Sequence, residues 1–466
     1  MIEYSCIFLI GDPDMPKKND IVTIEITDVS SDGLGIGKAD GYTLFVQSAF
    51  PGDIIKAKIV KVLKNYGFGI INKLVSPAPS RIESDCPSFG RCGGCSFRQI
   101  SYEAELKIKE NHVKNCMARI GGISAPVLSI IPSPKTDKYR NKAQFPASVG
   151  LDGNVKFGFY SKHSHRLVES ADLCKLHPKI FSDISDVIRV YCNNSKISVY
   201  DEVLGTGLLR HLFIRYGETT GDIMVCLVIN GTHLPNEQGL VSLLTSSVPG
   251  LKSIVINTNT KNTNEILGEK CRTLWGSDAI SDVLCGNLLN ISPLSFYQVN
   301  RSCTELLYNT AFDAASLSSS DVLLDLYCGI GSIGLSAAKR VKEVVGVEIV
   351  PQAVEDAKLN AARNGIKNAR FICADAKAAV SSLLKENIRP TVAIIDPPRK
   401  GCDERLLDDI SKMNLERIIM ISCNPSTAAR DCKYLSSLGY VPTVIQPVDM
   451  FPRTTHVETV VLLSRK

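Results

Sequence analysis

The chain has 466 residues, which is longer than one hydrophobic core usually extends, so two or three domains are expected. An apolar fraction of 44% excludes a disordered chain, and no apolar run is long enough for a membrane-spanning helix. Lys and Arg number 53 against 48 Asp and Glu, and this net charge of +5 permits a polyanionic partner without requiring one.

The beginning of the chain gives no sign of secretion. Its one short apolar stretch, residues 7–10, lacks the basic segment that precedes the apolar core of a signal peptide. We expect the natural start at Met15, because strand patterning begins just after it. Sixteen cysteines without a secretory signal indicate a reducing compartment and a cytoplasmic location, with most thiols buried, as for Cys226.

Residues 21–76 have the pattern of short strands joined by tight turns. Apolar and polar side chains alternate over residues 22–26, and Asp-Gly pairs mark the turns that follow. Lys56 and Lys58 alternate with apolar neighbours, which gives one side of the block a basic character. We expect a small antiparallel barrel of a kind that often binds nucleic acid, although a merely solvated lysine face fits equally well.

The middle of the chain is less regular. Residues 102–119 predict a helix that ends at Gly121-Gly122. Its apolar stripe is formed by Leu106, Ile108, Val113 and Met117. Residues 127–289 have a mixed and irregular pattern, with strand-like runs at 223–229 and 253–256.

From Val322 onward, strand-like runs alternate with helical stretches. The strand-like runs are 322–326, 343–347, 370–373, 392–395, 418–421 and 457–463. The helical stretches between them are 351–364, 404–413 and 427–438. This alternation predicts a doubly wound α/β domain with a largely parallel sheet, whose ligands bind at the carboxyl ends of the strands.

A cofactor-binding pattern follows the first of these strands. Residues 325–334 close a strand and open a helix, and their glycines let the backbone turn and approach a ligand closely. Glu348 ends the next strand, where a carboxylate receives ribose hydroxyls, and Asp375 follows the third, where an acid accepts a hydrogen bond from adenine. In the alternative reading, these acids only cap helices.

Two proline-containing motifs close the next two strands. Asp396-Pro397-Pro398-Arg399 follows the fourth and Ser422-Cys423-Asn424-Pro425 follows the fifth. Prolines at these points stiffen loops over the site. An Asp-Pro-Pro strand end favours recognition of a planar base over hydride transfer, which argues against a nicotinamide dinucleotide.

These motifs, together with Ser295-Phe-Tyr-Gln298, His456-Val-Glu-Thr459 and a cysteine cluster, resemble the RNA uracil-5-methyltransferases over nearly the whole chain. The resemblance is to the bacterial branch that methylates 23S rRNA, since the tRNA branch lacks the cysteine cluster. It implies a TRAM-like, OB-like β-barrel at 15–76, a central α+β domain at 77–292 and a Rossmann-like methyltransferase domain at 293–466. Helix 102–119 would pack on the catalytic domain.

The resemblance assigns chemistry to two residues. The Cys423 thiolate would add to carbon 6 of uracil and make carbon 5 nucleophilic towards the methyl group of S-adenosylmethionine. Glu458 would then remove the carbon-5 proton. The residues that would line the S-adenosylmethionine site are Gln298, Tyr327, Glu348, Asp375 and Asp396. Without the motifs, Cys423 would be read as a small buried residue and Glu458 as an exposed strand residue.

The cysteine cluster has the spacing of a metal-binding knuckle. Cys86, Cys92 and Cys95 are three thiol ligands, and Gly93-Gly94 frees the backbone to turn. Spacing alone fits zinc or an iron–sulfur cluster, with His177 as a further ligand for zinc. The resemblance supplies Cys174 as the fourth ligand and implies a structural [4Fe-4S] cluster.

The expected partner is RNA, most of all 23S rRNA, with no membrane and a monomeric protein. Residues 156–160 and 162–166 interleave aromatic and basic groups as RNA contacts require, although a surface hairpin would look the same. Three rival readings remain: a tRNA uracil-5-methyltransferase, an adenine or guanine amino-methyltransferase that has no use for Cys423, and a cluster-bearing RNA-binding protein without activity.

Overall fold

The structure is a computed structural model that describes residues 16–162, 164–386 and 388–466. The expected start at Met15 lies outside the described residues. Contacts divide the chain into two compact units. Of the described residues, the first unit contains 16–85 with Cys95–Ile108 and Arg453–Thr455; the second contains Cys86–Gly94, Lys109–Pro452 and His456–Lys466.

The N-terminal block is a closed barrel with strand order β1-β2-β3-β5-β4, which confirms the predicted small barrel, but the β3–β5 pair is parallel, so the expectation of a wholly antiparallel barrel was wrong. Its strands are β1 (Ile21–Val29), β2 (Leu34–Ala39), β3 (Tyr42–Gln47), β4 (Ile54–Val62) and β5 (Tyr66–Ser76). On β4 the apolar Ile55 and Ala57 are fully buried, whereas Lys56 is exposed. The alternation read from the sequence is therefore the division between barrel interior and basic exterior.

The central region is a seven-stranded sheet of order β12-β11-β10-β9-β6-β7-β8. Its strands are β6 (Lys142–Val149), β7 (Val155–Tyr160), β8 (Leu167–Glu169), β9 (Leu209–Tyr216), β10 (Ile223–Ile229), β11 (Leu251–Thr258) and β12 (Lys270–Gly276). The sequence reading of this region as irregular was wrong. Only β10 and β11 were recognised, because the other strands carry charged residues that hide their period.

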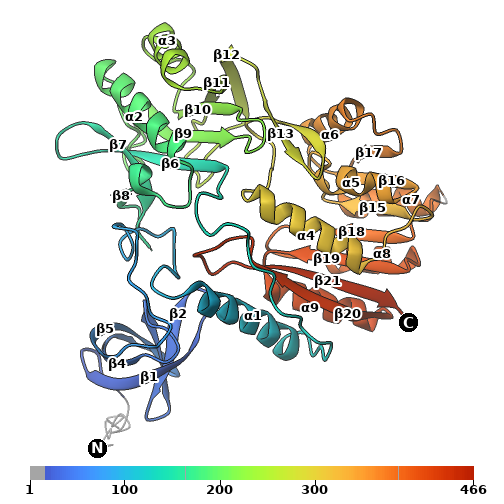
Figure 1. Ribbon diagram of the computed structural model, residues 1–466, viewed down its shortest axis with the longest axis horizontal. Helices are drawn as coiled ribbons and strands as arrows, with labels where there is room; N and C mark the ends of the chain where they lie inside the picture. Colours follow the sequence, from blue (N-terminus) through green and yellow to red (C-terminus); the bar gives the residue numbers. More distant parts are fainter. Residues whose placement is uncertain (1–15, 163, 387) are drawn as a thin grey trace, which may run out of the picture. The chain divides into compact units, whose positions relative to one another are not determined.

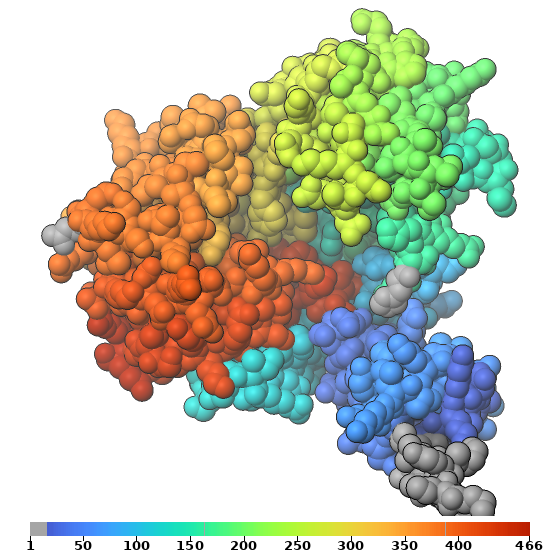
Figure 2. All heavy atoms as spheres, turned by 180° about the vertical axis from the view of Figure 1, so that it is seen from behind, coloured from blue at the N-terminus to red at the C-terminus, as the bar shows by residue number. Residues whose placement is uncertain are grey.

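Helices cover one face of this sheet. α2 (Lys179–Asn194) and α3 (Glu237–Ser247) contact each other, and they pack on β7 and on β11 and β12 respectively (Figure 1). Beneath them lies a core that includes Phe145, Phe181 and Leu227. β12 is an edge strand with mostly exposed side chains, and Figure 2 shows this yellow-green region at the surface.

The C-terminal region is a second seven-stranded sheet of order β17-β16-β15-β18-β19-β21-β20. Its strands are β15 (Val322–Leu326), β16 (Glu343–Glu348), β17 (Ala369–Cys373), β18 (Val392–Ile395), β19 (Arg417–Ser422), β20 (Tyr440–Val448) and β21 (Glu458–Arg465). β21 pairs antiparallel with both β19 and β20, and the remaining pairs are parallel. The predicted doubly wound sheet is confirmed; β20 was missed because its two prolines interrupt the apolar pattern.

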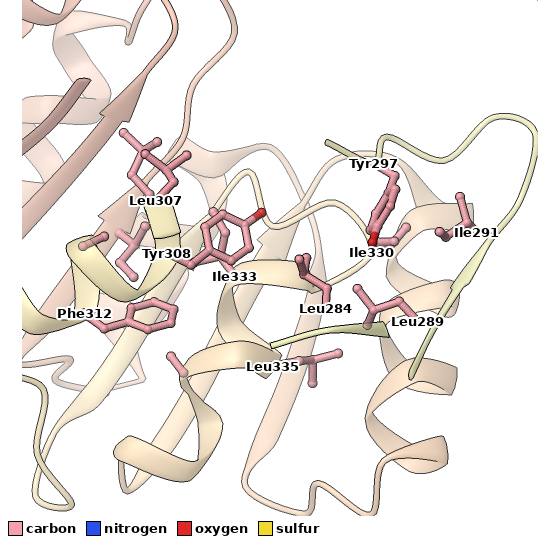
Figure 3. Close-up of a cluster of buried hydrophobic side chains, with 14 of the residues drawn as sticks. Leu284, Leu289, Ile291, Tyr297, Leu307, Tyr308, Phe312, Ile330, Ile333 and Leu335 are labelled. Carbon is pink, nitrogen blue, oxygen red and sulfur yellow. The ribbon is translucent and has the colours of Figure 1, made fainter. Parts of the chain in front are cut away.

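Helices surround this sheet (Figure 1). They are α4 (Arg301–Ala314), α5 (Ser332–Ala337), α6 (Pro351–Arg363), α7 (Ala376–Lys385), α8 (Glu404–Lys412) and α9 (Pro425–Ser437). A hairpin of β13 (Ile280–Leu284) and β14 (Asn287–Ile291) adds to the same core. Figure 3 shows side chains of this hairpin, of α4 and of the segment around α5 packed together, with Leu284, Leu289, Tyr308 and Ile333 among them.

Helix α1 (Tyr102–Arg119) has the predicted bounds, but its buried face differs from the predicted stripe. Val113 and Met117 are buried, Leu106 and Ile108 are only partly buried, and Lys109 is 1% exposed. Lys109 Nζ lies 2.6 Å from Oδ1 of Asp449 and donates to the carbonyl oxygen of Phe451. A charged side chain is buried here because a partner carboxylate accompanies it.

Replacing Lys109 by Met is expected to lower the free energy of unfolding by about 3–5 kcal/mol, because the Asp449 carboxylate would stay buried without its counter-charge. Urea denaturation measures this change. Lys107→Met on the exposed side of the same helix is the control and should alter stability by less than about 0.5 kcal/mol. Equal stability of the two variants would contradict the prediction.

Within the residues that the structure describes, no helix combines the length and the apolarity that a membrane crossing would need.

Candidate active site

Two predicted catalytic residues are brought together by an antiparallel register. The last paired residues of β19 and β21 are Ser422 and Thr459. Cys423 directly follows Ser422 and Glu458 directly precedes Thr459, so the same register sets Cys423 opposite Glu458 at the carboxyl end of β19. Both side chains line one hollow of about 630 Å³.

The loop that carries Cys423 is held by the start of α9. Asn424 caps this helix, its side chain accepting from the Ser426 N–H at 3.2 Å, and Pro425 occupies the first turn, where its missing N–H costs nothing. The Asn424 side chain also donates to the carbonyl oxygen of Arg399 at 3.0 Å. The two proline-containing motifs are therefore tied to each other beside the hollow.

The electrostatics of the site favour neutral groups at rest. Burial raises the pKa of the Cys423 thiol, and so does the negative charge of Glu458; the guanidinium of Arg399 opposes the shift. Burial, with the charge of Asp396, raises the pKa of Glu458 to about 8. Burial alone raises the pKa of Asp396 to about 7. A cysteine and a carboxylic acid so placed can exchange protons near neutral pH.

Arg399 and His456 lie next to each other in the lining of the hollow. The Arg399 guanidinium donates to the imidazole of His456 at 3.1 Å. Burial, followed by the charge of Arg399, lowers the pKa of His456 to about 4, so its ring is neutral at physiological pH and can accept this hydrogen bond. Arg399 thus lies at a fixed place near Cys423 and Glu458.

The predicted cofactor loop lies at the adjoining strand ends. The buried Asp325 accepts from the N–H of Gly334 at 2.8 Å, and Glu348 accepts from the N–H of Gly329 at 3.1 Å. Tyr327 has a backbone φ of +64°, a value that residues other than glycine rarely adopt, and Gly331 has a φ of +82°. The turn from β15 to α5 is therefore fixed by side-chain carboxylates and is open towards the hollow.

A second hollow of about 600 Å³ continues the first. Tyr327 and Glu348 line both, and Asp375 lines the second. Gln298 and Asp396 line the first hollow with Cys423. Asp375 also caps α7 by accepting from the Lys377 N–H at 3.1 Å, so the capping role considered from the sequence is real and coexists with its place in the hollow.

Removal of the Glu348 carboxylate is expected to raise the KM for S-adenosylmethionine at least about tenfold, because the group predicted to receive the ribose hydroxyls is lost. The kcat should change little. Initial rates of methyl transfer by Glu348→Ala at varied cosubstrate concentration measure both. Glu343→Ala, at the other end of the same strand in a surface ion pair with Arg370, is the control; equal KM values for the two variants would contradict the prediction.

The four predicted cluster ligands, Cys86, Cys92, Cys95 and Cys174, do not form a compact metal-binding group in the part of the chain that the structure describes. Cys92 lies near enough to Cys86 for the charge of Cys86 to contribute to its raised pKa, after burial. Cys174 Sγ lies 3.1 Å from Nδ1 of His177. Across the described residues, no three or more His, Cys, Asp or Glu side chains are grouped closely enough to hold a metal ion.

Several lining residues had been assigned no role from the sequence. Phe296, Arg399 and His456 stand inside recognised motifs, and Phe296 is 66% exposed although it is aromatic. Lys142 opens β6 and Arg140 lies two residues before it, and the alternation of polar side chains along this segment was the available signal. Burial lowers the pKa of Lys142 to about 8, with help from the charges of Arg215 and Arg140.

The fold and the site define a doubly wound α/β domain with a nucleotide-type loop and a cysteine–glutamate pair at its carboxyl edge. The family model described as tRNA (Uracil-5-)-methyltransferase matches residues 289–466, and the TRAM domain model matches residues 17–71. An uncharacterized RNA methyltransferase of Halalkalibacterium halodurans is 43% identical over 97% of this chain and 98% of its own length. An uncharacterized RNA methyltransferase of Bacillus cereus is 41% identical over 96% of this chain and 97% of its own.

Among solved structures, the tRNA (uracil-54, C5)-methyltransferase of Pyrococcus abyssi in complex with S-adenosyl-L-homocysteine matches 95% of this chain and 100% of its own. The TM-score is 0.74 and the sequence identity 27%. The chain therefore belongs to the RNA uracil-5-methyltransferase family, and its N-terminal barrel is a TRAM domain.

Proposed function

We propose that the protein transfers the methyl group of S-adenosylmethionine to carbon 5 of a uracil in 23S rRNA through a covalent bond to Cys423. The observation that carries the proposal is the placement of Cys423 and Glu458 opposite each other in one hollow that continues into the cofactor loop. An amino-methyltransferase would have no use for a thiol there.

In the proposed reaction the Cys423 thiol loses its proton to water, and the thiolate sulfur forms a bond to carbon 6 of uracil. The electron pair of the carbon 5–carbon 6 double bond moves into the ring as an enolate. Carbon 5 of this enolate then attacks the sulfonium methyl group. The methyl–sulfur bond breaks, and S-adenosylhomocysteine leaves with the electron pair of that bond. The first hollow accommodates the uracil beside Phe296, and the second accommodates the nucleoside part of the cosubstrate.

Release of the product requires a base. Glu458 takes the proton from carbon 5, the electron pair of that carbon–hydrogen bond re-forms the double bond, and the Cys423 thiolate leaves. Arg399 favours the thiolate at both ends of the cycle, because its positive charge opposes the rise that burial causes in the pKa of Cys423. Glu458 is only 3% exposed, so water has little access to its carboxyl group while that group holds the proton taken from carbon 5.

Methylation of total RNA from a strain without the gene tests the activity and the choice of substrate. Purified protein and labelled S-adenosylmethionine should produce 5-methyluridine, identified by mass spectrometry of nucleosides, in the 23S rRNA fraction. Labelled 5-methyluridine in the tRNA fraction would instead show that the protein is a tRNA uracil-5-methyltransferase. Label in N-methylated purines would overturn the uracil reaction, and the absence of label would favour an RNA-binding protein without activity.

We further propose that Cys86, Cys92, Cys95 and Cys174 hold an iron–sulfur cluster of the [4Fe-4S] type. The chemistry of four thiols suits it, and the backbone of Gly93 is tied by its N–H to the carbonyl oxygen of Tyr160 at 2.9 Å, which fixes the turn between two of the ligands. When bound, the cluster would tie the chain around residue 90 to the segment that carries Cys174. The proposed methyl transfer needs no electron from it.

Iron and sulfide analysis of protein purified without oxygen tests this proposal. Four irons per chain, lost in Cys174→Ser and retained in Cys373→Ser, is the expected result. Cys373 is an exposed thiol at the end of β17, outside the predicted ligand set. One zinc per chain would overturn the cluster in favour of a zinc site, and metal-free folded protein would overturn both.

A further inference from the structure

The central region contains a hollow that the proposed reaction does not use. It measures about 370 Å³ and lies where β6, β7 and β9 meet the segment 262–266. The residues that matter for its chemistry are Gln144, Tyr160, His165, Glu202, Arg210 and His211. Its volume lies at the small end of the range of ligand pockets, which suits one nucleotide-sized group.

One wall of the hollow is a planar aromatic surface held in place. The rings of Tyr160 and His165 are stacked, with centroids 5.1 Å apart and an angle of 26° between planes. Glu202 accepts a hydrogen bond from the Tyr160 hydroxyl at 3.2 Å and lies 2.6 Å from Nδ1 of His165. The side chain of His165 is 69% exposed, so an incoming planar group can stack on a ring whose orientation is already fixed.

Two polar side chains of β9, Arg210 and His211, also line the hollow. Arg210 is 7% exposed and donates to the carbonyl oxygens of Asn259 and Lys261 at 2.9 and 2.8 Å. Its guanidinium lies 4.3 Å from the centroid of the Tyr200 ring. Nε of Arg210 and Nδ1 of His211 are buried without a hydrogen-bond partner among the described residues. Both residues line the hollow, and a polar ligand edge that reached these atoms would recover the free energy that an unpaired buried polar group costs.

This hollow adjoins the candidate active site. Gln144 of β6 lines both hollows, and Arg140 and Lys142 line the catalytic one. Alternate polar residues of the segment that enters β6 and of β6 itself thus lead from the place of the target uracil to the hollow beside Tyr160. The carboxylates of Glu202 and Glu265 also line it, which disfavours a phosphate group and favours a base that offers N–H donors.

We propose that this hollow binds a second, unstacked base of the RNA substrate, close in sequence to the uracil that is methylated. The inference rests on the proposed function, since it takes RNA as the substrate. Bases in folded RNA are recognised when they leave the stack and lie on aromatic side chains, and a two-pocket arrangement would read the RNA beyond the reacting ring. The methyl transfer at Cys423 does not itself require a bound second base.

The test compares variants of the full-length protein on total RNA from a strain without the gene. Tyr160→Ala and His165→Ala should raise the KM for RNA about tenfold, with kcat at saturating RNA and the KM for S-adenosylmethionine within about twofold. Tyr160→Phe keeps the aromatic ring, so its KM for RNA should rise less than that of Tyr160→Ala. His233→Ala is the matched control, because His233 is also an exposed histidine beside a carboxylate, that of Glu237, and lies outside the hollow.

Ultraviolet crosslinking of the wild-type protein to the same RNA, followed by mass spectrometry of peptides, provides a readout that is independent of activity. A nucleotide attached to a peptide containing Tyr160 or His165 supports the proposal. Overturning results are unchanged KM values in both alanine variants, or crosslinks confined to peptides that line the catalytic hollow. If the wild-type protein transfers no methyl group, the proposed function fails, whereas the crosslinks still decide the fate of the second hollow.

Discussion

Cys423→Ala is expected to lower methyl transfer to RNA by about 10³-fold or more, because carbon 5 of uracil attacks a sulfonium only after a sulfur atom has added to carbon 6. The variant should also fail to form a covalent adduct with RNA containing 5-fluorouridine. In that RNA, fluorine replaces the proton that must leave, so the wild-type enzyme stays attached after methyl transfer. Denaturing gel electrophoresis with labelled S-adenosylmethionine measures both effects.

The control for this experiment is a second thiol. Cys373→Ala removes an exposed cysteine at the end of β17 and should keep full activity and adduct formation. Binding of S-adenosylhomocysteine by Cys423→Ala should match the wild type, which shows that the hollow is intact. Methylation by Cys423→Ala at the wild-type rate, or an adduct formed without that sulfur, would remove the basis of the covalent mechanism.

Glu458→Gln is expected to lower turnover by about 10²- to 10⁴-fold and to accumulate the methylated covalent intermediate on unmodified RNA. The amide cannot take the carbon-5 proton, so addition and methyl transfer proceed while elimination stops. This outcome differs in kind from that of Cys423→Ala, which should form no intermediate. Quenched-flow sampling and denaturing electrophoresis follow the attached RNA.

The same residue predicts a pH dependence. Burial raises the pKa of Glu458 to about 8, so below that value the carboxyl is protonated and cannot act as a base. The rate of elimination should therefore rise with pH, about tenfold per unit below the pKa, and level off above it. Glu416→Gln, an exposed carboxylate on the loop before β19, is the control and should keep this profile. Rapid elimination by Glu458→Gln, with an unchanged pH profile, would assign the base to another group.

Local sequence patterns determined the secondary structure elements and turns that depend on a few neighbouring residues. The barrel strands were readable because a two-residue period separates Ile55 and Ala57 from the exposed Lys56. The parallel strands of the C-terminal sheet are buried on both faces and form continuous apolar runs, such as Val392–Ile395. The cofactor loop was readable because tight turns need glycine, whatever surrounds them.

Tertiary structure decided which of these pieces meet. Nothing in the sequence around Glu458 indicates that β21 inserts antiparallel beside β19, and only that register sets Glu458 opposite Cys423. The sequence pattern gave Lys109 no place in the apolar stripe of its helix, yet Lys109 is buried against Asp449, which lies 340 residues away in the chain. The order of the central sheet was missed because β6 pairs with the distant β9 and because several of its strands carry charges that hide their period. Short-range periodicity predicts which side chains of one helix or strand are buried. Sheet order and buried ion pairs depend on contacts between segments that are distant in the sequence.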